Sequence, residues 1–129
     1  KSIKGLHILL AEDNELNMEI AEFMLQNEGA DVTKAWNGRE AVEIFRKSEP
    51  DEFDVILMDI MMPVMNGYEA TKMIRSLERE DAKTIPIIAM TANAFTEDRL
   101  KAKEAGMDEH IAKPVDPELL VKVIYESVN

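Results

Sequence analysis

The sequence contains no cysteine, no long apolar run and little positive charge. The absence of cysteine excludes a disulfide scaffold, a thiolate metal site and a cysteine nucleophile. No apolar run approaches the roughly 20 residues that a membrane-spanning helix needs, and the N-terminus lacks a signal-peptide core. We therefore expect a cytoplasmic domain without membrane contact. With 15 basic and 26 acidic side chains the net charge is −11, which repels a phosphate backbone and argues against direct nucleic-acid binding.

The remaining composition is that of one ordinary globular domain. Hydrophobic residues make up 46% of the 129 residues and charged residues 32%, and a chain of this length buries a full core without disulfides. The chain begins at Lys1 and its first methionine is Met18. We therefore expect a piece of a longer protein, in which residues 1–5 are a linker remnant and residues 6–129 form the domain.

Short apolar runs alternate with amphipathic stretches five times along the chain. The runs predict strands over residues 6–11, 31–36, 53–58, 85–90 and 109–112. This alternation is typical of an α/β fold, a doubly wound five-stranded parallel sheet of (βα)5 type with helices on both faces. For five units the common solution is the flavodoxin-like strand order 2-1-3-4-5, in which ligands bind at the carboxyl ends of the strands.

Three acidic residues follow strands that are neighbours in this order. Glu12 and Asp13 come after the first strand and Asp59 after the third, while Thr91 and Lys113 end the fourth and fifth. Three like charges about 5 Å apart repel by about 3 kcal/mol for each pair at an effective dielectric near 20. Because the repulsion summed over the three pairs rivals the stability of a small domain, positive charge must lie among the three carboxylates. Lys113 and a divalent cation would supply it.

The residue types at this edge indicate phosphoryl chemistry. Oxygen ligands without histidine or cysteine favour a hard cation, and Mg²⁺ binds few carboxylates together with water and phosphate. An aspartate that attacks phosphorus forms an aspartyl phosphate, while a lysine and a hydroxyl stabilise the phosphoryl oxygens. Glycine-rich phosphate-binding loops are absent from the first turn, Ala11–Glu15.

Four short segments at the ends of the predicted strands resemble those of response-regulator receiver domains. They are Leu10–Asn14 (LAEDN), Met58–Gly67 (MDIMMPVMNG), Met90–Ala94 (MTANA) and Ile111–Pro114 (IAKP). The first and third are especially similar to receiver domains of hybrid sensor histidine kinases. The resemblance implies a phosphorelay role in two-component signal transduction, as a signalling switch or relay, with a histidine kinase or a histidine phosphotransfer domain as partner.

The resemblance also implies roles for the residues of the reaction. Asp59 is the phosphoacceptor, Thr91 holds a phosphoryl oxygen and Lys113 pairs with the phosphate. Pro114 is expected to follow a cis peptide bond. The domain would catalyse only its own phosphorylation and dephosphorylation, although the parent chain could be a hybrid histidine kinase.

The metal ligands and the switch residues follow from the same resemblance. Asp13 and Asp59 are expected to bind Mg²⁺ directly, Glu12 through water, and Met61 through its carbonyl. The switch comprises Thr91 and an inward-turning aromatic residue on the fifth strand, but here that position holds His110. Imidazole is smaller and more polar, so we expect weak coupling and a relay more than an output switch.

Two other functions stay open at this point. A Mg²⁺-dependent phosphohydrolase could work through an aspartyl phosphate, but in that class a second acid stands two residues after the nucleophile, where this chain has Met61. An inert interaction module would not require the full set of site residues. The sequence names neither stimulus nor cognate kinase, and we expect a monomer.

Overall fold

The computed structural model describes residues 2–92 and 96–129, and the side chains of these except 96 and 97. Five parallel strands form one sheet in the order β2-β1-β3-β4-β5. They are β1 (His7–Ala11), β2 (Asp31–Ala35), β3 (Val55–Asp59), β4 (Ile87–Thr91) and β5 (Glu109–Ala112). The predicted fold class and strand order are confirmed.

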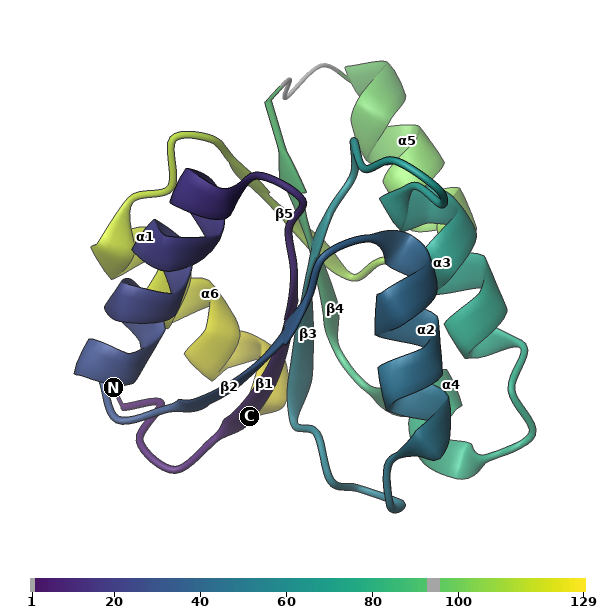
Figure 1. The fold of residues 1–129 in the computed structure, drawn as a ribbon, viewed down its shortest axis with the longest axis horizontal. Helices are drawn as coiled ribbons and strands as arrows, with labels where there is room; N and C mark the ends of the chain where they lie inside the picture. Colours follow the sequence, from purple (N-terminus) through teal and green to yellow (C-terminus); the bar gives the residue numbers. More distant parts are fainter. Residues whose placement is uncertain (1, 93–95) are drawn as a thin grey trace.

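The helices cover both faces of the sheet, as Figure 1 shows. They are α1 (Glu15–Asn27), α2 (Gly38–Lys47), α3 (Gly67–Arg75), α4 (Glu80–Thr84), α5 (Thr96–Ala105) and α6 (Pro117–Val128). Helices α1 and α6 lie on one face, and α2 to α5 on the other. Every residue of β3 and β4 is buried, because these central strands are covered on both sides. None of the helices in the described residues is long and apolar enough to cross a membrane.

Side-chain caps fix where several helices begin. Asn14 caps α1 and Asp116 caps α6, where Pro117 occupies the first helical position, in which a missing amide proton costs no hydrogen bond. Since the caps of α1, α2 and α3 follow the ends of β1, β2 and β3, these helices start beside the carboxyl edge of the sheet. The residues between strand end and helix start are therefore held close together at that edge.

The first residues of the chain contact the domain. From the sequence we expect residues 1–5 to be linker, yet the side chain of Ile3 is fully buried against the α1 and α6 side of the core. The amide of Gly5 donates to the carbonyl of Gly29 at 2.9 Å. Ile3 is thus part of the hydrophobic core, whereas the domain boundary itself stays a prediction.

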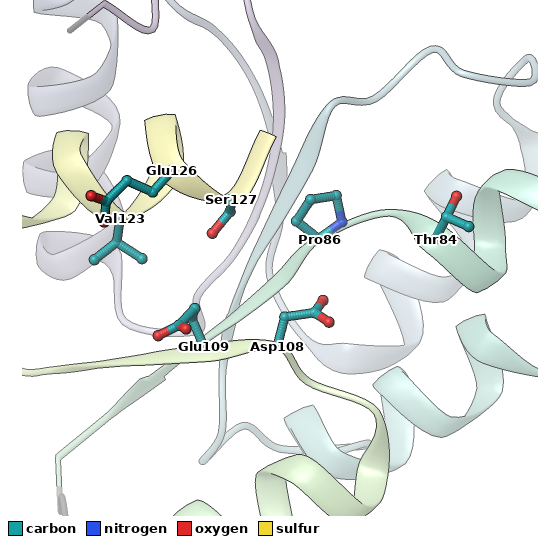
Figure 2. Close-up of a pocket in the computed structure, with 7 residues that line it drawn as sticks. All are labelled: Thr84, Pro86, Asp108, Glu109, Val123, Glu126 and Ser127. Atoms are coloured by element: carbon teal, nitrogen blue, oxygen red, sulfur yellow. The ribbon is translucent and has the colours of Figure 1, made fainter. Parts of the chain in front are cut away.

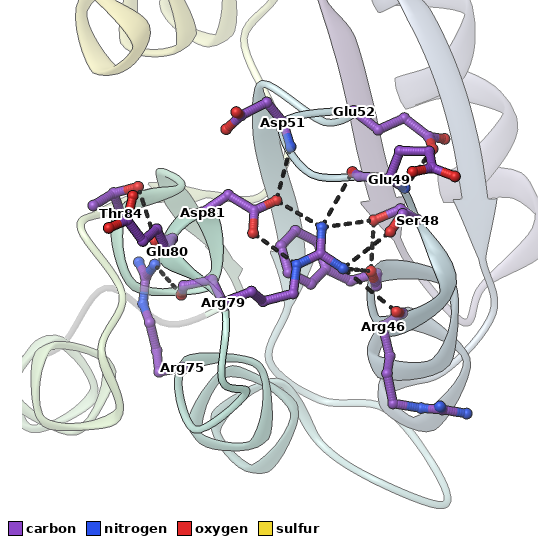
Figure 3. A network of polar contacts seen from close by, with 12 residues as sticks. Arg46, Ser48, Glu49, Asp51, Glu52, Arg75, Arg79, Glu80, Asp81 and Thr84 are labelled. Carbon is purple, nitrogen blue, oxygen red and sulfur yellow. Dashed lines mark hydrogen bonds and ion pairs between the residues drawn. The ribbon is translucent and has the colours of Figure 1, made fainter.

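Helix α4, which the sequence does not predict, is stabilised by the side chain of Arg79 (Figure 3). The guanidinium donates two hydrogen bonds of 2.7 Å to Asp81 and lies 4.7 Å from the centre of the Phe45 ring. It also donates to the carbonyls of Phe45 and Ser48 at the end of α2, both at 3.0 Å. Asp81 also accepts from the amide of Asp51 at 3.0 Å, which ties the loop before β3 to the same network.

Candidate functional site

Three carboxylates meet at the carboxyl edge of the sheet. Glu12 and Asp59 are only 2% and 4% exposed, whereas Asp13 is open to solvent. One oxygen of each lies within 4.8 Å of the others. They meet because β1 and β3 are adjacent and parallel, so the residues at their ends share one edge. The convergence expected from the sequence is therefore present.

Lys113 places a positive charge between two of these carboxylates. Its ammonium lies 2.7 Å from Glu12 Oε1 and 3.2 Å from Asp59 Oδ1. Burial alone would lower the pKa of Lys113, but the hydrogen bond to Glu12 and the charge of Asp59 raise it above its ordinary value. The Lys113–Pro114 peptide bond is cis, the isomer expected from the sequence. Lys113 is thus held as a cation at the centre of the cluster.

The positive charge of Lys113 does not balance the cluster. Burial, and then the charge of Glu12, raise the pKa of the Asp59 carboxyl from 3.8 to about 7, against the opposing effect of Lys113. A further cation would relieve this repulsion. The oxygen-only ligand set fits a hard divalent ion such as Mg²⁺. Glu12 already accepts from Lys113 through Oε1 and from the amide of Asn14 through Oε2 at 3.1 Å, so it is the least free of the three to bind such an ion directly.

Met61 lies in the loop between β3 and α3, two residues after Asp59. Its side chain is 76% exposed. An exposed thioether next to a carboxylate cluster offers no hard ligand and no exchangeable proton. The side chain therefore does not contribute to the acidic cluster, and the carbonyl group is what Met61 can offer to a metal ion.

Thr91 and His110 line one small crevice that is too narrow for a water molecule. Thr91 is buried at the end of β4, and His110 lies half-buried on the neighbouring strand β5. The crevice is also lined by Ile60, the residue after Asp59, and by Asp98 and Arg99. The structure thus brings the two expected switch residues to the same place. Asn93 and Ala94, the last residues of the segment that begins at Met90, lie outside the described residues.

An apolar stripe on α1 is a surface whose exposure the sequence does not reveal. Leu16, Ile20 and Phe23 recur at helical spacing but face solvent, and Phe23 is 71% exposed. The buried side of the helix is formed instead by Met18, Ala21 and Leu25. The sequence does carry one sign of this surface. Large apolar residues occur around more of the circumference of α1 than a single buried face requires. Large exposed apolar patches of this kind mark contact surfaces.

Two hollows lie near these elements, at opposite ends of the sheet. A groove of about 410 Å³ separates α1 from the loop after β5 and is lined by Ile20, Met24 and Lys113, among others. The other, of about 300 Å³, lies at the amino end of β4 and β5 (Figure 2). There Asp108 accepts hydrogen bonds from Arg75 and from the amide of Ile87, both at 2.9 Å, which is a structural role.

Comparisons with known proteins point to one family. A family model described as "Response regulator receiver domain" matches residues 8–125. The chain is 41% identical over 119 residues to hybrid signal transduction histidine kinase I of Dictyostelium discoideum, covering 91% of this chain and 7% of that protein. It is 38% identical over 156 residues to histidine kinase 1 of Arabidopsis thaliana, covering 96% of this chain and 13% of that protein. The chain therefore spans a small part of these relatives.

Solved structures match over nearly the whole chain. The receiver domain of sensor histidine kinase PA1611 from Pseudomonas aeruginosa has a TM-score of 0.87 at 39% identity, covering 96% of this chain and 98% of that one, and it holds a magnesium ion in its active-site cleft. A chain in the co-crystal of the Saccharomyces cerevisiae phosphotransfer protein Ypd1 and the Ssk1 receiver domain has a TM-score of 0.87 at 32% identity, covering 98% and 90%. The family model, the relatives and the fold together show that the chain belongs to the response regulator receiver domain family of two-component systems.

Proposed function

We propose that the domain accepts a phosphoryl group from a phosphohistidine onto Asp59 in a Mg²⁺-dependent reaction. The observation that carries this proposal is the position of Asp59, buried between Glu12 and Lys113 at the end of β3 with an uncompensated negative charge. A carboxylate destabilised by its surroundings is stabilised by a cation bound to it, and that cation also attracts the phosphoryl oxygens of a donor. The magnesium ion in the receiver domain of PA1611 supports the choice of cation.

In this reaction an Asp59 oxygen attacks phosphorus while the bond from phosphorus to the donor imidazole nitrogen breaks. The product is an aspartyl phosphate, and the donor histidine leaves neutral once it has its proton. Lys113 lies within reach of Asp59 and stabilises the phosphoryl oxygens, and the Thr91 hydroxyl donates to one of them. Bound Mg²⁺ would neutralise charge on the carboxylate and on the phosphoryl oxygens.

The metal would be held by the exposed carboxylate of Asp13, by Asp59 and by the Met61 carbonyl, with Glu12 acting through water. The hydrogen bonds that already engage both oxygens of Glu12 support its indirect role. Asp13 is the member of the cluster that solvent reaches, so it is the natural point of entry for a hydrated ion.

The partner would be a histidine kinase or a histidine phosphotransfer domain that docks on α1. Leu16, Ile20 and Phe23 form an apolar stripe on this helix, which begins two residues after Asp13. A partner helix packed on the stripe would bring its phosphohistidine to the acidic cluster. The co-crystal of Ypd1 with the Ssk1 receiver domain, and the hybrid kinases among the relatives, support this class of partner and a hybrid kinase as the parent chain.

The test uses phosphoramidate, a small donor with the nitrogen–phosphorus bond of phosphohistidine. With Mg²⁺ the intact mass of the chain should rise by one phosphoryl group, and chelation with EDTA or the change Asp59→Asn should abolish the rise. Labelling of the Asn variant would place the acceptor elsewhere. Steady release of phosphate from a phosphomonoester would instead favour the phosphohydrolase.

A further inference from the structure

Helices α2 and α3 begin with the same four-residue pattern, Asn-Gly-x-Glu. It occurs at residues 37–40 and again at 66–69. In both copies the asparagine side chain accepts from the amide of the glutamate at 2.9 Å, which caps the helix. The two helices lie side by side (Figure 1). Gly38 lies against the backbone of Met65 and Asn66, the residues just before Gly67, so the starts of the two helices are close together.

Each glycine lies in close contact with backbone atoms of the segment that runs from Asp59 to Asn66. A Cβ on Gly67 would collide with the Asp59 carbonyl oxygen, and a Cβ on Gly38 would collide with the Met65 carbonyl oxygen and lie 2.9 Å from the Met65 carbonyl carbon. The Gly67 amide donates to Ile60 O at 2.9 Å, and the Gly38 amide donates to Met65 O at 3.0 Å. The start of α2 therefore touches the β3–α3 loop with no room for a side chain.

That loop contains a strained turn. Val64 has φ of 68°, a conformation that a β-branched residue rarely adopts. The amide of Met65 donates to Pro63 O at 2.7 Å, which closes a three-residue turn around Val64. Strain of this kind persists only where neighbouring structure holds it. Met65, the last residue of the turn, is held by Gly38.

We propose that Gly38 is a positioning residue for the phosphoacceptor site. At its Cβ position, Gly38 faces backbone atoms of Met65 and Asn66, not the carboxylates of the acidic cluster. By its contact with Met65 it fixes the loop that carries Met61, and with it the approach of the Met61 carbonyl to the acidic cluster. Gly38 lacks the positive φ that only glycine tolerates, so alanine fits the backbone of α2 and only the loop has to move. The inference rests on the proposed function of that cluster.

The first test compares Gly38→Ala with Asn37→Ala. Gly38→Ala should weaken Mg²⁺ binding, measured by calorimetry, about tenfold, as changes behind a metal ligand commonly do. It should also slow phosphorylation by phosphoramidate at subsaturating Mg²⁺. Asn37→Ala removes the cap of α2 but places no atom against Met65. It should lower the melting temperature while leaving the Mg²⁺ dissociation constant unchanged.

The second test uses the unsubstituted chain and does not depend on whether a variant folds. Because coupling is reciprocal, a contact that favours Mg²⁺ binding must itself be strengthened by Mg²⁺. Mg²⁺ should therefore slow hydrogen exchange of the Gly38 amide by about the same tenfold factor. The neighbouring amide of Arg39, for which the described residues show no hydrogen-bond acceptor, is the internal control.

Three results would overturn the inference. Native Mg²⁺ affinity in Gly38→Ala would show that the loop does not need the contact. Equal weakening in Asn37→Ala would assign the effect to the stability of α2, and unchanged exchange of the Gly38 amide would remove the coupling. Absence of Mg²⁺ binding by the unsubstituted chain is a different failure, because it would overturn the proposed function itself.

Discussion

The surroundings of Asp59 oppose the negative charge of its carboxylate. Because its pKa rises from 3.8 to about 7 in the folded chain, the folded state holds a proton that the unfolded state releases between these pH values. The contribution of Asp59 to stability is therefore most favourable below pH 4. It becomes increasingly unfavourable as the pH rises toward 7, the reverse of an ordinary salt-bridged aspartate.

The direction of this pH dependence can be tested in the absence of metal. In EDTA at pH 8, Asp59→Asn should raise the free energy of unfolding by about 2 to 4 kcal/mol, because it removes a buried charge without removing volume. The gain should shrink as the pH falls and vanish near pH 4. Urea unfolding at pH 4, 6 and 8 measures it. A variant less stable than the native chain at pH 8 would mean that Lys113 more than offsets the burial of Asp59.

Asp13 differs because its side chain is exposed and, among residues 2–92 and 96–129, no basic side chain forms an ion pair with it. Mg²⁺ should raise the melting temperature of the native chain by binding the folded state, and Asp13→Asn should remove that rise without lowering the stability of the metal-free chain. Glu19→Gln, which removes one exposed negative charge on α1, is the matched control and should keep the Mg²⁺ effect. If Asp13→Asn destabilised the metal-free domain strongly, Asp13 would be a structural residue.

Among the elements, those with a periodic apolar pattern could be predicted and those made by tertiary contacts could not. The five strands follow from short apolar runs. Helix α4 has five residues and no apolar periodicity, and it exists because Arg79 ties it to the end of α2. The stripe of Leu16, Ile20 and Phe23 on α1 has helical spacing, but spacing does not tell which of two apolar faces a sheet will cover.

The Arg79 network predicts a large effect from a conservative change. Lysine keeps the charge beside Asp81 but cannot reach several carbonyls at once, so Arg79→Lys should lower the free energy of unfolding by about 2 kcal/mol. Arg46→Lys is the control, because Arg46 pairs with Glu43 in solvent, where such pairs contribute little. Equal effects of the two changes in urea unfolding would contradict the role of Arg79 in linking α4 to the end of α2.

For the whole molecule, the sequence pattern predicts which residues form the acidic cluster better than it predicts how the loop beside the cluster is held or how the domain switches. The strand order brings Glu12, Asp59 and Lys113 together, so the cluster could be predicted from strand ends alone. The contact of Gly38 with Met65 could not, because it depends on how two helix starts approach one loop. The effect of His110 on switching cannot be predicted from a sequence pattern either, because it depends on the free-energy difference between the unphosphorylated and phosphorylated states.

His110 should make the domain a weak switch. With Mg²⁺ and beryllofluoride, hydrogen exchange across α5, β5 and α6 should change little in the native chain, because imidazole gains less apolar contact than an aromatic ring when it turns toward Thr91. His110→Tyr should enlarge the change over the same elements. Large changes or dimerisation in the native chain would show that His110 switches efficiently.

The most direct test of the central claim, that Asp59 is a phosphoacceptor assembled around Mg²⁺, is a crystal structure of the chain grown with Mg²⁺ and beryllofluoride. We predict beryllium bonded to an Asp59 carboxylate oxygen, with Lys113 and Thr91 on its fluorides. Mg²⁺ should be bound by Asp13, Asp59 and the Met61 carbonyl. Beryllofluoride on another residue, or an unmodified Asp59 in crystals that contain Mg²⁺ elsewhere, would contradict the claim.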